Sequence, residues 1–312
     1  IFVVFIFIFF LRVLFIYLGE KDLFLFLPDQ DRYLNESQAF ENIESFNPLN
    51  FSDFFGNSHW FYYFFNYLVL SLFGNEIYIK IINSIISIIA GLVLILFLKK
   101  QTNSLKISDS LFLWALIPDV LVWSTLYNLK DSFILFFYVV LVTKAFDLLK
   151  ENKYKFSLTK IIFTITGFLL FFTRSYLLLI ILISMFCYLI FKHTRINKIF
   201  ILGISFVLVF IFFNYTIDLS NLVIAKTFPE YLQSIFRFIL TPFGFFSFSE
   251  FYYNFIGIYY IIGISLFVLM FIKVRVINDL NFYLFLNFFT YIIFYGFLII
   301  NNGPRQKLPL TI

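Results

Sequence analysis

Long apolar runs, separated by short polar intervals, extend along almost the whole chain. A helix that crosses a bilayer needs roughly 20 apolar residues, and its backbone groups must all be hydrogen-bonded within the helix. Spans are predicted at about 1–18, 77–98, 111–127, 132–149, 161–191, 199–213, 255–272 and 281–300. The pattern therefore predicts an all-α, polytopic transmembrane helical bundle in which residues 1–312 form one membrane domain.

Two of these runs contain a predicted break. The run 161–191 is longer than a hydrocarbon core of about 30 Å can hold, and it carries Arg174 midway. Two short spans that turn at residues 173–175 fit better than one tilted helix, which brings the total to about nine. The run 111–127 contains Pro118, which interrupts a helix.

One long polar interval, residues 20–58, and one mixed segment, residues 214–254, interrupt the apolar pattern. The first is an acidic loop. It carries Glu20, Asp22, Asp29, Asp31, Glu36, Glu41, Glu44 and Asp53 against only Lys21 and Arg32. The aromatic segment that follows, residues 59–73, suits a helix lying at the level of the lipid headgroups.

Composition excludes a soluble globular domain, because 62% of the residues are hydrophobic and only 13% are charged. The chain starts without Met inside an apolar run, so it reads as a fragment. One cysteine excludes an internal disulfide, and two histidines leave little for a histidine-based metal site. The sequence contains no nucleotide-binding loop, no serine-histidine-aspartate pattern and no surface typical of nucleic-acid binding.

Basic residues concentrate in the short loops 99–110, 150–160, 192–198 and 273–279, which the positive-inside rule assigns to the cytoplasm. Alternation then assigns the other loops to the external face without conflict. That face receives the acidic loop and several widely separated charges. These are Lys130, Asp131, Arg174, Arg237, Arg305 and Lys307.

A lone Arg or Lys at a membrane boundary is often an anchor that snorkels. Several cations and carboxylates on one face suit a substrate with a phosphate and a reacting hydroxyl, since cations hold phosphate oxygens and a carboxylate accepts a proton. Asp119 could serve as a mid-helix structural partner or in function. His59 could assist at the interface or anchor the start of its helix.

Several motifs then show a resemblance to a known family. Residues 28–34 read Pro-Asp-Gln-Asp-Arg-Tyr-Leu, residues 72–74 read Leu-Phe-Gly before Lys80, a Pro-bearing span precedes Lys130-Asp131, and residues 305–309 read Arg-Gln-Lys-Leu-Pro. In order and spacing the chain resembles the bacterial membrane glycosyltransferases of the C-type superfamily fold, which include protein mannosyltransferases and the lipid A aminoarabinose transferase. The family's second acidic residue is replaced by Gln30.

The resemblance implies transfer of a sugar from a polyprenyl-phosphate donor to a glycan, lipid or protein acceptor at the external face of a bacterial inner membrane. It places Asp29 at the catalytic position. Either Asp31 substitutes for the second acid, or a metal-assisting role of that acid is lost. Arg174, Arg237, Lys130 or Arg305 would hold the phosphate, with Asp131, Lys307 and His59 in the same site. The resemblance leaves open whether transfer requires a divalent cation.

Two other functions fit parts of the pattern. A cell-envelope polysaccharide polymerase or ligase would use external arginines on a lipid pyrophosphate, although its large working loop usually comes late in the chain. A lipid-linked sugar flippase or transporter would line a path through the bilayer with charges and often shows repeat symmetry. The early acidic loop and the gathering of charges at one face favour the transferase.

Overall fold

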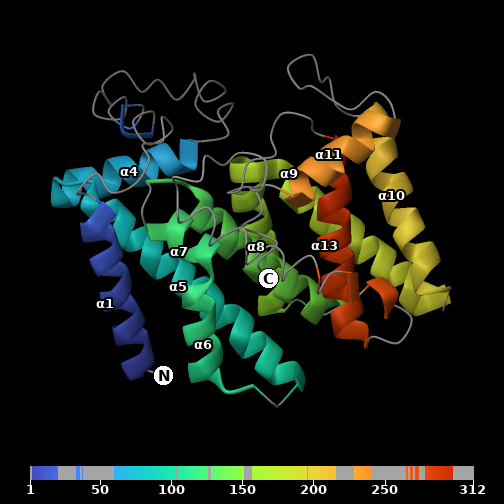
Figure 1. Ribbon diagram of the computed structural model, residues 1–312, viewed down its shortest axis with the longest axis horizontal. Helices are drawn as coiled ribbons and strands as arrows, with labels where there is room; N and C mark the ends of the chain where they lie inside the picture. The colour runs from blue at the N-terminus through green and yellow to red at the C-terminus, as the bar shows by residue number, and fades with distance from the viewer. Residues whose placement is uncertain are drawn as a thin grey trace. The chain divides into compact units, whose positions relative to one another are not determined.

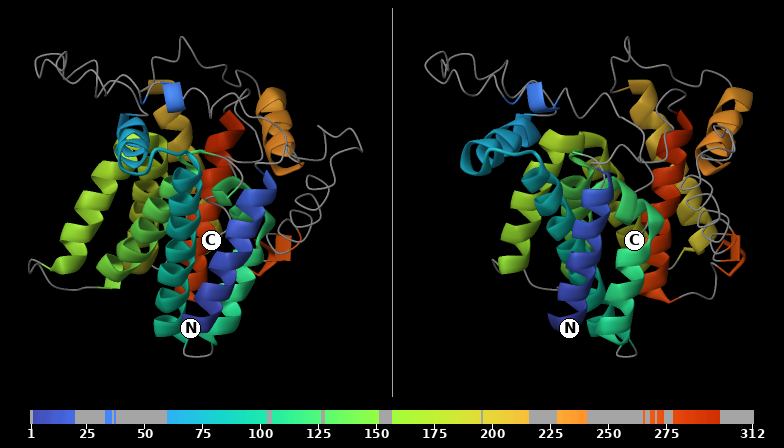
Figure 2. Two further views of the ribbon diagram at one scale, coloured as in Figure 1. Left: turned by 90° about the vertical axis from the view of Figure 1, so that its left-hand side faces the viewer. Right: turned by 60° about the vertical axis from the view of Figure 1, so that its left-hand side comes forward.

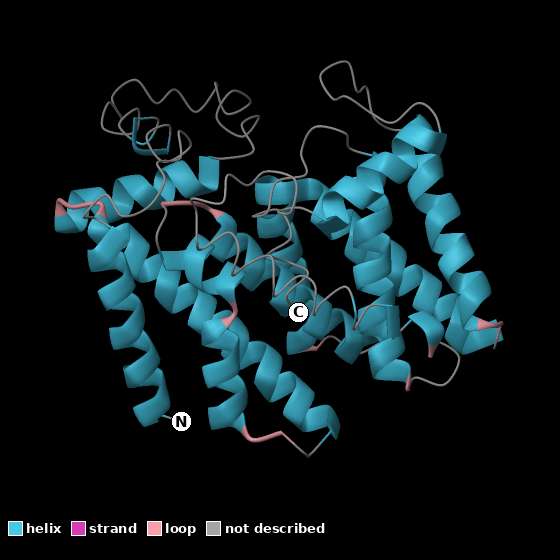
Figure 3. Cartoon of the chain, viewed as in Figure 1, coloured by secondary structure: helices cyan, strands magenta, loops and turns pink. Residues whose placement is uncertain are grey.

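A computed structural model describes most of the predicted helices. The described residues are 2–19, 33–35, 37, 60–102, 105–125, 128–150, 157–194, 196–215, 228–240, 265, 268–269, 271–273 and 278–297. Every element in this described part is a helix, and it contains no strand (Figure 3). The predicted all-α class is confirmed to that extent.

The chain divides into two compact units. Unit 1 comprises Ile1–Thr143 and Ile161–Ser175, and unit 2 comprises Lys144–Lys160 and Tyr176–Leu310. Two helices, α8 (Asp131–Lys150) and α9 (Leu158–Thr194), pass from one unit to the other. The prediction of one membrane domain over the whole chain stays a prediction.

Unit 1 is a bundle of apolar helices (Figure 1). Its remaining helices are α1 (Phe2–Gly19), α4 (Trp60–Phe73), α5 (Ile77–Thr102), α6 (Ile107–Leu116) and α7 (Pro118–Thr125). α1 packs against α5, α6 and α7, and α4 packs against α5. The predicted break at Pro118 is confirmed, because Ile117 separates α6 from α7 with a non-helical ψ of 119°.

One end of unit 1 collects several helix ends (Figures 1 and 2). There α1 and α7 end, α5 and α8 begin, and α4 lies across them. The end of α1 and the start of α4, between which the acidic loop lies in the sequence, are both at this end. Both attachment points of that loop therefore lie at one end of the bundle.

Unit 2 contains α10 (Lys198–Tyr215), α11 (Phe228–Leu240) and α13 (Asp279–Phe297), with α13 packed against both others. A chain of buried hydroxyls joins three helices, since Thr290 Oγ1 lies 2.7 Å from Ser205 Oγ and 3.3 Å from Ser184 Oγ. Residues 228–240 were expected in a loop. They form a helix because one face, with Tyr231 and Ser234 buried, packs on α13.

Three helical segments are long and apolar enough to cross a membrane in the part of the chain that is described: Ile77–Gln101, Asp131–Lys150 and Tyr176–Thr194. Shorter apolar helices occur at Phe2–Leu18, Phe61–Phe73, Ile107–Leu116 and Lys198–Phe212. Large apolar side chains such as Phe2, Phe10 and Phe200 are exposed on these helices, as expected of surfaces that face lipid.

Candidate functional site

The turn between α7 and α8 carries buried charges. We call residues 128–131, Asn-Leu-Lys-Asp, the charged turn. The Lys130 side chain is 5% exposed and Asp131 is 2% exposed. Asp131 begins α8, where the unpaired N–H groups and the dipole of a helix favour a carboxylate.

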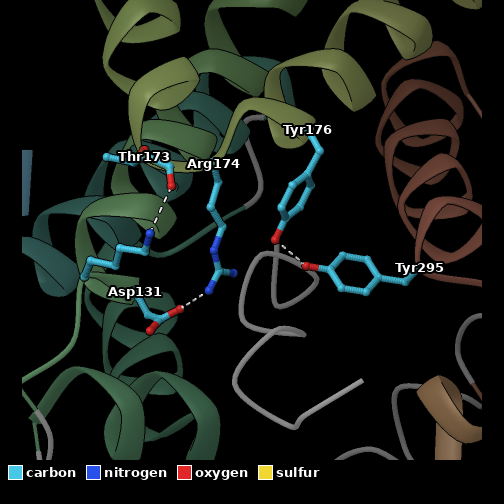
Figure 4. A network of polar contacts seen from close by, with 6 residues as sticks. Asp131, Thr173, Arg174, Tyr176 and Tyr295 are labelled. Carbon is cyan, nitrogen blue, oxygen red and sulfur yellow. Dashed lines mark hydrogen bonds and ion pairs between the residues drawn. The ribbon is translucent and has the colours of Figure 1, made fainter. Parts of the chain in front are cut away.

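A break in α9 brings a second cation to the charged turn. Arg174 has an extended backbone (φ −155°, ψ 81°) inside an otherwise helical segment. Its Nη2 donates to Asp131 Oδ1 at 2.9 Å, and Lys130 Nζ donates to the Thr173 carbonyl oxygen at 3.1 Å (Figure 4). The predicted break at residues 173–175 is confirmed, and it is the point at which α9 passes from unit 1 to unit 2.

The side chains of Lys130, Asp131 and Arg174 have a formal net charge of +1 and are largely buried. The side chains of Arg174 and Asp131 are 10% and 2% exposed. Each therefore needs the other, because removing one partner of a buried ion pair leaves an uncompensated charge. An ammonium and a guanidinium at one site can together bind the oxygens of a phosphate.

Buried aromatic and amide side chains support the charged turn from α4 and α5. The Tyr62 hydroxyl donates to Asn128 Oδ1 at 2.6 Å and accepts from Asn83 Nδ2 at 2.8 Å. The same Asn83 amide reaches the Leu129 carbonyl oxygen at 3.2 Å. Burial raises the pKa of the Tyr62 hydroxyl well above its ordinary value of 10.0, although the hydrogen bond from Asn83 opposes the rise.

Tyr33, the tyrosine of the acidic-loop motif, packs on this support. It is 4% exposed, and its ring meets the Tyr62 ring edge-on with centroids 5.1 Å apart. Its carbonyl oxygen accepts from Asn66 Nδ2 at 3.4 Å. The loop motif and the charged turn are therefore joined through α4.

Of the predicted site residues, the structure brings Lys130, Asp131 and Arg174 together. Asp29, Asp31, His59, Arg305 and Lys307 lie outside the described residues, as does the side chain of Arg237, whose backbone belongs to α11. Those assignments stay predictions.

Sequence reasoning gave no role to Tyr33, Tyr62, Asn83 or Asn128. Tyr33 lies in the quoted motif 28–34, and Tyr62 lies in the aromatic segment 59–73. A neutral side chain in an apolar helix gives no sign, in sequence, that it faces a charge.

A second polar cluster lies inside unit 1 around Arg12, which is fully buried. Its Nη1 donates to Ser124 Oγ at 3.0 Å, to the Ser84 carbonyl oxygen at 3.3 Å and to Ser87 Oγ. These acceptors are neutral. Arg12 shares the inner face of α1 with Ile8 and Ile16, so it joins three helices instead of snorkelling to the boundary.

Within unit 2, a tyrosine pair includes the first residue of α9 that belongs to this unit, Tyr176. The hydroxyls of Tyr176 and Tyr295 lie 2.5 Å apart (Figure 4), and the Tyr176 ring stacks on Phe294 with centroids 5.3 Å apart.

The described residues contain no group of three or more His, Cys, Asp or Glu side chains that could hold a metal ion. No family model, curated protein or solved structure matches the chain. The geometry of the charged turn and its support is therefore the basis for a functional proposal.

Proposed function

We propose that this chain is a membrane glycosyltransferase that moves a sugar from a polyprenyl-phosphate donor to an acceptor on the external face of a bacterial inner membrane. In this proposal the bundle crosses the membrane about nine times, with the charged turn at the external boundary. The donor's phosphate occupies the site formed by Lys130 and Arg174.

The observation that carries the proposal is the contact between Tyr33 and the support of the charged turn. Tyr33 belongs to the same motif as Asp29, residues 28–34. Its ring packs on Tyr62, whose hydroxyl bonds Asn128 of the charged turn. Asp31 and Asp29 precede Tyr33 in the sequence by two and four residues.

The proposed chemistry divides the work between the charged turn and the acidic loop. A cation pair stabilises the phosphate that departs from the anomeric carbon, and its strength grows where water is excluded. Asp29 acts as the general base that accepts the proton of the acceptor hydroxyl, and Asp31 assists it. Asp131 holds Arg174 in place while the site is free of donor.

The test is sugar transfer in membranes that contain the full chain, supplied with radiolabelled polyprenyl-phosphate sugars. Replacing a general base costs about 10²- to 10⁴-fold in rate, so Asp29→Asn should reduce transfer at least a hundredfold. Asp53→Asn, in the same acidic loop, is the matched control and should keep the wild-type rate.

Retention of the wild-type rate by a folded Asp29→Asn protein would overturn the catalytic assignment. Transfer from pyrophosphate-linked donors alone would indicate the polymerase or ligase. Movement of the lipid-linked sugar across the bilayer without cleavage would indicate a flippase.

A further inference from the structure

Tyr62 contacts both sides of the charged turn. Its hydroxyl bonds Asn128, at the start of the turn, and its ring meets Phe133, in the first turn of α8, with centroids 5.9 Å apart. Lys130 and Asp131 lie between these two contacts. A fully buried side chain that holds both flanks of a turn fixes the direction of the residues between them.

The same ring holds the acidic-loop motif. The rings of Tyr33 and Tyr62 meet at an interplanar angle of 82°, an edge-to-face geometry favoured by aromatic pairs. Tyr63 supports Tyr33 from a second side, with centroids 5.8 Å apart. Asn66, one helical turn after Tyr62, holds the Tyr33 carbonyl.

We propose that Tyr62 is a positioning residue that sets the acidic-loop motif at Tyr33 against the charged turn at Lys130 and Asp131. This inference rests on the proposed function for its catalytic consequence, because the motif carries the general base and the turn carries a phosphate ligand. The physical connection between the two segments stands without it.

The hydroxyl and the ring of Tyr62 act on different partners. The hydroxyl holds Asn128 and Asn83, whereas the ring holds Tyr33 by packing. Tyr62→Phe therefore loosens the turn and leaves most ring packing in place. Tyr62→Ala removes both connections.

The first measurement is amide hydrogen exchange on the full chain in detergent. Tyr62→Phe should exchange faster than wild type in the peptide containing residues 128–131, and Tyr62→Ala should also do so in the peptide containing Tyr33. Tyr78→Phe is the matched control, since Tyr78 is 42% exposed and lies outside both contacts. Unchanged exchange at 128–131 in folded Tyr62→Phe overturns the inference, whatever the activity.

The second measurement is the kinetics of sugar transfer. A positioning role predicts that Tyr62→Phe lowers kcat roughly tenfold, the scale expected for one or two lost hydrogen bonds, with the KM for donor little changed. If Tyr78→Phe lowers kcat as much as Tyr62→Phe does, the positioning role of Tyr62 is contradicted. If Tyr62→Phe alters amide hydrogen exchange at residues 128–131 but the wild-type chain transfers no sugar from any donor, the proposed function is rejected. The positioning role of Tyr62 between the two segments is then still supported.

Discussion

The ion pair between Asp131 and Arg174 should be strongly coupled. Coulomb's law at a 2.9 Å separation and an effective dielectric constant of about 20 gives roughly 6 kcal/mol of attraction. Desolvation of two side chains that are 2% and 10% exposed offsets about half or more of this. We expect a net coupling of about 2–3 kcal/mol, within the range measured for close charge pairs.

The chain provides its own control pair. Lys144 Nζ lies 3.8 Å from Asp147 Oδ2, with side chains 30% and 17% exposed. A partly exposed pair at i, i+3 on a helix contributes only about 0.2–0.5 kcal/mol. The two coupling energies should therefore differ severalfold.

Double-mutant cycles with alanine measure both couplings. All three tryptophans precede residue 143, so tryptophan fluorescence follows unfolding of unit 1. Cys187, the single cysteine, is buried in unit 2, so its reaction with a thiol dye follows unit 2. Titration with sodium dodecyl sulfate in mixed micelles gives the free energy of unfolding of each variant, and the cycle of four variants gives the coupling energy. A coupling below about 0.5 kcal/mol for Asp131 and Arg174, equal to an exposed pair, would refute the buried site.

Two packing predictions use the same probes. Gly91→Ala should destabilise unit 1 by about 1–3 kcal/mol, because a Cβ there would lie 2.2 Å from Cδ1 of the buried Trp114 ring. Gly203→Ala is the control, because a Cβ at residue 203 would have no neighbouring atom within 4 Å. This substitution should leave the stability of unit 2 unchanged or raise it by up to about 1 kcal/mol. Thr290→Val should lower the stability of unit 2 by about 1–2 kcal/mol, since Ser205 loses its hydroxyl partner; an unchanged midpoint would contradict the interhelical bond.

Much of the fold could be predicted from apolar runs and breakers. The bounds of α1, α5, α8, α10 and α13 lie within a few residues of the predicted spans, because run length reports helix length directly. The breaks in the third and fifth runs were also predictable. Pro118 indicates the break in the third run, and Arg174, a charge in the middle of an apolar run, indicates the break in the fifth.

The site could be predicted only where charges mark it. Lys130, Asp131 and Arg174 are conspicuous in an apolar chain, and the structure places them in contact. Their neutral support could not be predicted, since the pairing of Tyr62 with Asn128 depends on how α4 lies across the bundle. Arg12 was visible as a charge, but the serines near its guanidinium lie on α5 and α7, far from α1 in the sequence.

The central claim is cleavage of a polyprenyl-phosphate-linked sugar. Its most direct measurement is the release of free polyprenyl phosphate from a panel of such donors by membranes containing the full chain. The proposal predicts time-dependent release from at least one donor, reduced at least about a hundredfold in Asp29→Asn. Absence of release from every monophosphate-linked donor, together with release from pyrophosphate-linked ones, would contradict it.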